Sequence, residues 1–396
     1  MANNNKHTGP NVPALRFPEF SGEWEYKSLG EIGESLIGLT YSPSDVVKEG
    51  GTIVFRSSNI QDGVIDYGDL VRVSKKIKDS IITRDGDLLI CARNGSTRLI
   101  GKNALLKKSD EGQTFGAFMM VFRSIDNRFV HQLLSTKAYS TQVSENLGAR
   151  INQITTRNFA EYTFGMPQTS EEKEKIGTFL ELINDRIETQ SKIIKELTTL
   201  RSALLEKVFQ VSNPTLEVGA IAHQTSERNK LCRYSNVLSV SNRFGFINQS
   251  EQFEDRNVAS DDVRNYKVVH RGDFAYNPAR INVGSIAMLK SFESGIVSPM
   301  YICFQVDDTI VDPSFFELFL ETKAFKDEME IRLEGSVRRC LSFEALCEIH
   351  MPRPALLVQR SITDKIGNIS SKIKLEDRIL RAYIRQKEWL LKQMFI

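Results

Sequence analysis

The 396-residue sequence has few cysteines, and none stands in a pattern typical of cysteine chemistry. There are 5 of them, an odd number, and no two have CxxC spacing. Such usage is typical of reduced thiols and argues against a disulfide scaffold or a structural zinc site. We therefore expect a cytoplasmic protein that has no metal site of its own.

Other absences further limit the class of protein to which the chain can belong. The net charge is only +2, with 52 Lys and Arg against 50 Asp and Glu, so no global basic field indicates a nucleic-acid partner. No apolar run approaches the ~20 residues that span a bilayer, and Met1–Pro10 is too polar for a secretory signal. The hydrophobic content of 41% predicts a globular protein without membrane association, and the length predicts two or three domains of ~100–200 residues.

The motifs of common nucleotide- and cofactor-dependent enzymes are also missing. There is no GxxxxGK[ST] phosphate loop, no GxGxxG after a strand, and no HExxH or HxxxH pair among the 5 histidines. Tyr276-Asn277-Pro278-Ala279 only partly matches the Asn/Asp-Pro-Pro-aromatic motif of amino-methyltransferases. Glu171-Glu172-Lys173 has the Glu-x-Lys spacing of many nucleases, but at a helix start it is interpreted as solvated first-turn charge. The sequence thus predicts a non-catalytic chain without a cofactor.

What the sequence does contain is an internal repeat with a period near 186 residues. Leu204–Phe209 returns as Leu390–Phe395, and Thr136–Tyr139 returns as Thr322–Phe325. Three shorter matches keep the same order: Gly86–Leu88 with Gly272–Phe274, Met166-Pro167 with Met351-Pro352, and Lys175–Gly177 with Lys365–Gly367. The repeat predicts two similar mixed α/β domains over residues 1–167 and 212–354. Each is followed by a helical segment, 168–211 and 355–396.

Within the two domains, short runs of strand-forming residues stand between turn residues. The expected strands are Thr52–Phe55, Asp87–Ala92, Ala117–Arg123, Asp273–Asn277 and Met300–Gln305. One amphipathic helix is expected near the end of each domain: Arg128–Leu147 before Gly148, and a second from Asp312-Pro313 to Gly335.

The two helical segments share a heptad pattern, in which apolar residues recur in alternating steps of four and three. These positions are Ile176, Leu180, Ile183, Ile187, Ile194, Leu197 and Leu204 in the first helix, and Ile366, Ile369, Ile373, Leu380 and Leu390 in the second. Polar residues interrupt both patterns at matching places, Gln190 with Glu376 and Arg201 with Lys387. We predict that the helices pair as an antiparallel coiled coil, which gives the chain a pseudo-twofold repeat. Packing of each helix on its own domain alone is the alternative.

Polar loops rich in Arg, Asn and Ser recur at equivalent places in both domains. Arg can make a bidentate contact with guanine and Asn with adenine, and Ser can donate to phosphate oxygens. These loops are therefore candidate DNA-binding segments. The candidates in the first domain are Arg56, Ser57, Asn59, Arg93, Asn94, Ser96, Arg98, Arg150, Asn152 and Gln153. Those in the second are Asn242, Arg243, Asn277, Arg280, Asn282, Ser285, Arg338 and Arg339. Loops are polar in any protein, and only their recurrence at equivalent places in both domains makes these segments candidates.

The chain also resembles a known family. Val12–Phe20, Trp24-Glu25 and Lys27–Glu31 are similar to the opening of specificity subunits of type I restriction–modification systems. The Met-Pro dipeptide before a long helix that closes on Leu-Leu-x-x-x-Phe, and the duplication at about 400 residues, are also typical of this family. The resemblance covers essentially the whole chain.

The resemblance implies a reader of double-stranded DNA that is not itself an enzyme. Two target recognition domains would each read one half of an asymmetric bipartite sequence, and the helices would set the spacer. Two modification subunits docked on the helices would carry S-adenosylmethionine and methylate adenine N6. Restriction (translocase) subunits would add ATP- and Mg-dependent cleavage. A coiled-coil scaffold with two protein-binding modules, or a methyltransferase in its own right, remain the alternatives.

Overall fold

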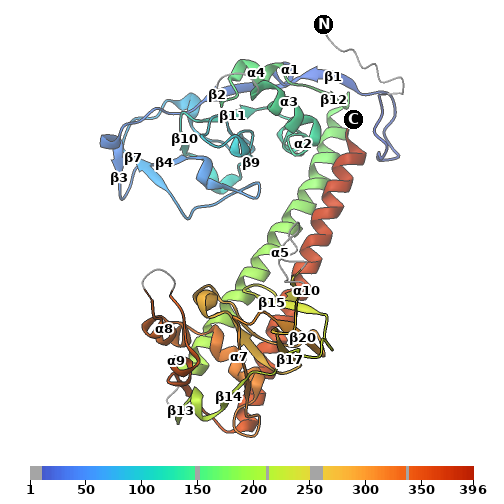
Figure 1. Cartoon of the computed structure of the whole chain (residues 1–396). Coiled ribbons are helices and arrows are strands. Elements are labelled where there is room, and N and C mark those ends of the chain that lie inside the picture. The colour runs from blue at the N-terminus through green and yellow to red at the C-terminus, as the bar shows by residue number, and fades with distance from the viewer. Residues whose placement is uncertain (1–10, 148–151, 211–213, 250–261, 336–338) are drawn as a thin grey trace. The chain divides into compact units, whose positions relative to one another are not determined.

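The structure, a computed structural model, describes residues 11–147, 152–210, 214–249, 262–335 and 339–396 (Figure 1). The chain divides into two compact units. Unit 1 comprises residues 1–191 and 378–396, and unit 2 comprises residues 192–377. Each unit therefore contains one globular domain and half of each long helix, whereas the sequence suggested separate helical segments.

Unit 1 contains two four-stranded sheets. The first has the order β2-β11-β8-β9, formed by Glu34–Ile37, Met119–Arg123, Leu88–Cys91 and Asn103–Leu105. The second has the order β10-β4-β7-β3, formed by Thr114–Phe115, Thr52–Phe55, Val71–Val73 and Val46–Val47. Two small ribbons pair β1 (Glu25–Ser28) with β12 (Thr163–Met166), and β5 (Ile60–Gln61) with β6 (Val64–Ile65). The helices of the domain are α1 (Leu29–Ile32), α2 (Asn127–Leu133), α3 (Lys137–Leu147) and α4 (Thr156–Glu161).

Unit 2 repeats the strand order of the first sheet, whereas its second sheet has the fourth strand at the opposite edge. One sheet has the order β14-β21-β18-β19, formed by Ala222–Thr225, Ile302–Val306, Phe274–Tyr276 and Ile286–Met288. The other has the order β16-β15-β20-β17, formed by Gly245–Asn248, Val237–Ser241, Ser294–Val297 and Lys267–His270. A ribbon joins β13 (Thr215–Glu217) to β22 (His350–Pro352), and the helices are α7 (Pro313–Glu321), α8 (Lys323–Arg332) and α9 (Phe343–Cys347). The predicted mixed α/β fold with two similar domains is confirmed.

The repeated Gly-Asp motif forms the same turn in both units. Gly86 and Gly272 have φ values of 81° and 93°, in the left-handed region that favours glycine. The aspartates that follow, Asp87 and Asp273, are buried, and each accepts a hydrogen bond from the backbone N–H three residues earlier. The turn therefore starts β8 and β18 in the same way, which explains why this short motif recurs.

The repeated Thr-Lys-Ala-aromatic motif separates two helices. The sequence predicted one helix across each motif, and this prediction is wrong. The Thr136 hydroxyl donates to the carbonyl of Leu133 and accepts from the N–H of Tyr139, so α2 ends and α3 begins. In unit 2 the Thr322 hydroxyl bonds the corresponding groups of Phe319 and Phe325 between α7 and α8. A threonine side chain that satisfies both free helix ends makes this break favourable.

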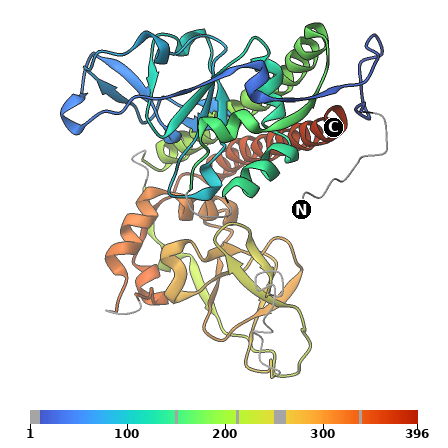
Figure 2. The ribbon, with the colours of Figure 1, turned by 90° about the horizontal axis from the view of Figure 1, so that it is seen from above.

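Two helices much longer than the others, α5 (Ser170–Gln210, 41 residues) and α10 (Leu356–Met394, 39 residues), run through both units. In unit 1, Leu180 and Ile183 of α5 share a core with Leu390 and Met394 of α10. Figures 1 and 2 both show these two helix segments side by side. In unit 2, the Arg201 guanidinium of α5 donates to the Ser370 hydroxyl of α10 at 2.7 Å. The amino-terminal part of each helix thus lies against the carboxy-terminal part of the other.

The heptad positions are those that the helices bury, with one exception. Of the predicted pairing residues, Ile176, Leu180, Ile183, Ile366 and Leu390 are buried, and Ile187, Ile194, Leu197, Ile369, Ile373 and Leu380 are half-buried. Leu204 is 37% exposed, and the next residue, Leu205, is buried in its place. Leu205 shares a core with Phe209 and with α7, so the seam gives way to domain packing at this end of α5. The prediction for Leu204 is therefore wrong.

Two residues near the amino terminus, Arg16 and Trp24, hold the start of α5 in place through hydrogen bonds to Glu172. Arg16 donates to both carboxylate oxygens of Glu172 at 2.7 Å, and the Trp24 indole N–H donates to the same carboxylate at 3.2 Å. Glu172 is buried, and the adjacent Lys173 is also buried, with its ammonium 2.7 Å from Asp126. The interpretation of Glu172 and Lys173 as solvated is therefore wrong, whereas Glu171 is exposed as predicted.

Replacing Glu172 with Gln is expected to lower the free energy of unfolding by about 3 kcal/mol, because it leaves the Arg16 guanidinium without its countercharge in a mostly buried place. Urea unfolding of the two chains measures the difference. Glu174→Gln is the matched control: Glu174 lies two residues along the same helix in an exposed pair with Arg128, which is worth less than about 1 kcal/mol. Equal effects of both substitutions would contradict a stabilising role of the buried Arg16–Glu172 ion pair.

Candidate nucleic-acid interface

In unit 1, three predicted loop segments come together at one end of the strands. Segment 93–98 follows β8, and the Asn94 side chain donates to the Ser57 hydroxyl in the segment that follows β4. Arg93 forms an antiparallel bridge with Gln153, and the N–H of Ile154 donates to the carbonyl of Ala92. Segments 56–59, 93–98 and 152–153 therefore form one surface, called the unit 1 loop face below.

The unit 1 loop face carries exposed cations without acidic partners. Arg93, Ser96, Arg98 and Asn152 are all exposed. Among the described residues, neither Arg93 nor Arg98 has an ion-pair partner, and the Arg93 guanidinium lies 5.1 Å from the centre of the Phe118 ring. Exposed, unpaired guanidinium groups of this kind are available to phosphates and to base edges.

The same convergence occurs in unit 2. The Ser285 hydroxyl donates to the carbonyl of Val240, just before the turn that holds Asn242 and Arg243. The N–H of Leu341 donates to the carbonyl of Pro278, which brings the third segment alongside. Segments 239–243, 277–285 and 339–341 form the unit 2 loop face. Its exposed polar residues are Asn242, Arg243, Arg280 and Asn282, and among the described residues neither arginine has an ion-pair partner.

Two of the predicted contact residues have structural roles instead. Asn59 is fully buried: its amide donates to the carbonyls of Asp66 and Asp69, and its oxygen accepts from the N–H of Arg56. Ser285 is buried, with its hydroxyl used inside the loop face. Because neither side chain can reach a base, the prediction that they contact DNA is corrected.

Several other residues predicted to contact DNA already make ion pairs or hydrogen bonds within the protein. Arg56 pairs with Asp69 at 2.7 Å, and Arg339 pairs with Glu330 at 2.9 Å. The Asn277 oxygen accepts from the N–H of Ala279, which caps the short helical turn containing Arg280. Asn277 thus positions Arg280, and the incomplete methyltransferase-like motif has this structural explanation. Arg150 and Arg338 lie outside the described residues.

Sequence reasoning missed the apolar residues at these surfaces. Phe118 is exposed beside Arg93, and Phe244 is exposed beneath the Arg243 guanidinium, 5.1 Å from the ring centre. No sequence signal distinguishes them from core phenylalanines, because the turns that expose them are not visible in the pattern.

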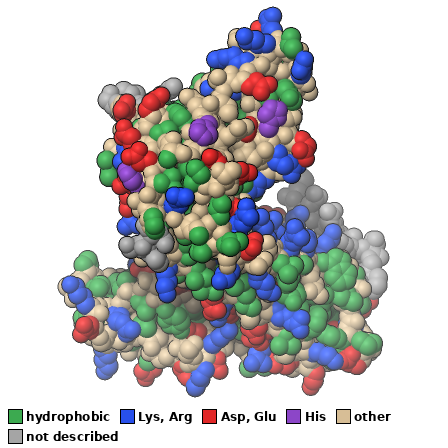
Figure 3. Space-filling view, turned by 90° about the horizontal axis from the view of Figure 1, so that it is seen from below, with side chains coloured by type: hydrophobic (Ala, Val, Ile, Leu, Met, Phe, Trp, Pro, Cys, Tyr) green, Lys and Arg blue, Asp and Glu red, His purple; other side chains and the backbone are tan. Residues whose placement is uncertain are grey.

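The face drawn in Figure 3 has no large patch of one charge. Acidic and basic side chains are intermixed over the face drawn in Figure 3, and the net charge of the whole chain is only +2. Any electrostatic attraction to DNA therefore depends on local arrangements such as the loop faces. Within the described residues no cluster of His, Cys, Asp and Glu suits a metal ion. No helix among them is long and apolar enough to cross a bilayer.

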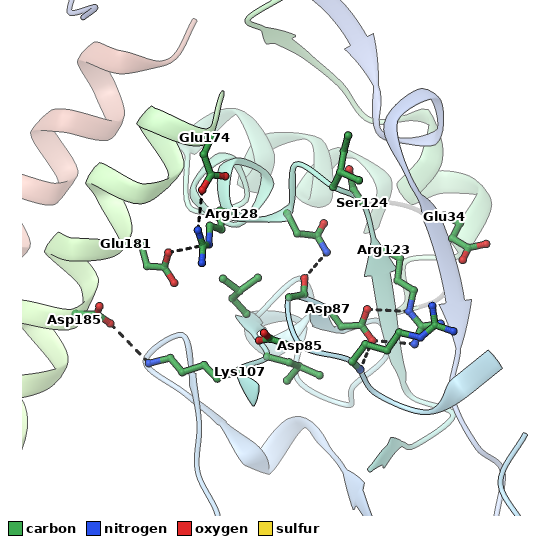
Figure 4. A pocket seen from close by; sticks show the side chains of 16 residues that line it. Glu34, Asp85, Asp87, Lys107, Arg123, Ser124, Arg128, Glu174, Glu181 and Asp185 are labelled. Carbon is green, nitrogen blue, oxygen red and sulfur yellow. Dashed lines mark hydrogen bonds and ion pairs between the residues drawn. The ribbon is translucent and has the colours of Figure 1, made fainter. Parts of the chain in front are cut away.

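Unit 1 also contains a pocket of about 730 Å³ between its first sheet and α5 (Figure 4). Its walls carry ion pairs between Arg123 and Asp87, between Arg128 and Glu174, and between Lys107 and Asp185. The lining holds six carboxylates, of Glu34, Asp85, Asp87, Glu174, Glu181 and Asp185, and four cations, of Arg84, Lys107, Arg123 and Arg128. An acidic excess disfavours a phosphate ligand, so the loop faces are the stronger candidates for contact with nucleic acid.

Residues 21–199 match the family described as the type I restriction modification DNA specificity domain. Two curated relatives each align over 193 residues, 46% of this chain. The specificity subunit of the type I restriction enzyme EcoKI of Escherichia coli (strain K12) is 28% identical, with 41% of its length covered. That of StySPI from Salmonella potsdam is 26% identical, with 42% covered. The alignment thus spans less than half of either relative. The predicted resemblance is confirmed over residues 21–199.

The fold comparison extends to the whole chain. The crystal structure of the S subunit of a type I restriction–modification system from M. genitalium superimposes with a TM-score of 0.63. The match covers 97% of this chain and 99% of that one, at 16% sequence identity. The two chains share one fold over nearly their whole lengths.

Proposed function

We propose, from the premise that residues 21–199 belong to the type I restriction modification DNA specificity family, that this chain is the DNA-reading subunit of a type I restriction–modification complex. The observation that carries the proposal is the recurrence of the loop face. In each unit, three separate polar segments meet and expose arginines that have no acidic partner within the described part of the chain. Arginine and asparagine are the side chains best suited to forked contacts with guanine and adenine in the major groove.

Each domain reads one half of a bipartite target. The two loop faces lie on domains whose first sheets have equivalent strand order, but they carry different residues: Arg93 and Arg98 in one, Arg243 and Arg280 in the other. A duplicated chain of this kind resembles a dimer on two half-sites, but with unlike half-sites. The complete target is therefore asymmetric.

The paired helices set the spacer between the half-sites and dock the modification subunits. At about 1.5 Å per residue, a helix of 41 residues is roughly 60 Å long, far more than one small domain needs for its own core. The helices also expose large apolar side chains away from their seam, among them Leu182, Leu200, Leu375 and Trp389. Such residues support burial against protein partners.

The chemistry belongs to those partners. Modification subunits with S-adenosylmethionine methylate adenine N6, and restriction subunits with ATP and Mg add translocation and cleavage. This chain contributes sequence reading and assembly.

Single-molecule methylome sequencing of host DNA, with and without this chain and with its modification partner co-expressed, tests the proposal. The expected result is a split, asymmetric motif with N6-methyladenine in both halves that disappears without this chain. Methylation that persists unchanged without this chain would show that the chain does not read the sequence, and would favour the scaffold alternative. A cofactor-binding assay on the purified chain tests the methyltransferase alternative.

A further inference from the structure

One turn is repeated in both units, and each copy presents a large apolar side chain. In unit 1, strand register places Met120 opposite Ile90 on β8, and Phe118 lies two residues before Met120. In unit 2, Ile302 lies opposite Tyr276 on β18, and Met300 lies two residues before Ile302. Ile90 and Tyr276 are each four residues after the glycine of the repeated Gly-Asp turn. Phe118 and Met300 are therefore structurally equivalent, although no sequence match connects them.

The backbone of the turn is also the same. The N–H of Met119 donates to the carbonyl of Gly116 at 2.8 Å, and the N–H of Tyr301 donates to the carbonyl of Ser298 at 3.0 Å. Each bond closes a four-residue turn whose third residue is the apolar one. Phe118 is 58% exposed and Met300 is 64% exposed. Neither side chain contributes to the core of its own domain.

Both turns lie directly beside the loop faces. In unit 1 the carbonyl of Phe118 accepts hydrogen bonds from the N–H groups of Ala92 and Arg93, and the Arg93 guanidinium lies over the ring. In unit 2 the N–H of Val240 donates to the hydroxyl of Tyr301, the neighbour of Met300, and the carbonyl of Val240 accepts from Ser285. In unit 1 the apolar side chain is thus in contact with an exposed arginine, and in unit 2 the turn that carries Met300 is joined through Tyr301 to the segment that leads to Arg243.

We propose that Phe118 and Met300 are apolar base-reading residues, each of which contacts the C5-methyl group of a thymine in its half-site. This inference rests on the proposed function. The arginines of the loop faces, which have no ion-pair partner among the residues that the structure describes, attract a polyanion, so DNA fits this surface better than an apolar protein partner does. In the major groove the thymine methyl is the apolar feature of the base edges, and it lies where arginine also finds its guanine acceptors.

The inference is tested by methylome sequencing of Phe118→Ala and Met300→Ala. We expect each variant to relax one thymine position, and only in one half-site, so that the other half-site serves as an internal control. Phe118→Met and Met300→Phe should keep both positions, because a large apolar group is retained. Ile125→Ala is the control. Ile125 is an exposed apolar residue that follows the opposite end of β11 from the turn, and its removal should leave the motif unchanged.

A second measurement separates the methyl contact from other roles. We expect the wild-type assembled complex to bind a target with deoxyuridine at that position about 3- to 10-fold more weakly, and Phe118→Ala to bind both targets equally. Equal wild-type binding to both targets would overturn the inference, and would favour a side chain wedged between bases. Loss of subunit assembly in the alanine variant would also overturn it, in favour of a protein contact. If wild type yields a split motif that Phe118→Ala and Met300→Ala leave unchanged, only this inference fails.

Discussion

Deleting one heptad from each long helix is expected to shorten the spacer of the methylated motif by about three base pairs and to leave both half-sites unchanged. Seven residues at about 1.5 Å each remove roughly 10 Å of helix. Stacked base pairs are about 3.4 Å apart. The whole heptad is needed because it returns the apolar seam to the same side of both helices. The recognition residues themselves are not altered.

The structure indicates where to cut. The Arg201–Ser370 contact fixes the register of the pair, which places Ile373–Ile379 opposite Lys192–Thr198. Neither segment contributes to the hydrophobic core of a domain. Replacing the outward-facing residues of both segments without changing their length is the matched control and should leave the spacer as it was. Altered half-sites with an unaltered spacer would show that the helices do not act as a ruler.

The repeat in the sequence predicted the fold well because each matched motif performs a local structural task. Gly86 and Gly272 are required by a left-handed backbone, and the heptads are required by a buried seam, so both leave periodic or positional signals. The helix break at Thr136 was missed because threonine is compatible with a helix interior. Only the hydrogen bonds on both sides of its hydroxyl show that it ends one helix and begins the next.

The loop faces were less predictable. Residue type and recurrence identified the loops, but burial separates Asn59, which holds its loop together, from Asn152, which is exposed. Glu172 was interpreted as solvent-exposed because its partners, Arg16 and Trp24, are about 150 residues away in the sequence. Phe118 and Met300 become comparable only through strand register. For Glu172, Phe118 and Met300 the missing information was a long-range contact, whereas for Asn59 it was the closure of its own loop.

Reversing the charge of the exposed loop-face arginines is expected to abolish methylation while the subunits still assemble. Arg93→Glu with Arg98→Glu should weaken specific binding at least about 100-fold, because two contacts worth about 1–3 kcal/mol each are lost and phosphate repulsion is added. Arg280→Glu should do the same through the other half-site. Binding of the assembled complex to its methylome-derived target, measured beside size-exclusion chromatography, gives both results. The scaffold alternative predicts no change in methylation.

Matched controls come from the opposite ends of the strands that carry the loops. Lys48 is exposed in the turn before β4, whereas Arg56 follows β4, and Arg233 is exposed before β15, whereas Asn242 follows it. Lys48→Glu with Arg233→Glu changes the net charge as much as Arg93→Glu with Arg98→Glu does, and Arg233→Glu alone as much as Arg280→Glu does, but these controls should leave the target largely bound. Neutral variants then separate the two kinds of contact. If Arg93 contacts guanine, Arg93→Gln relaxes one position of the motif. If it contacts phosphate, all sequences weaken alike and the salt dependence falls by about one unit of slope.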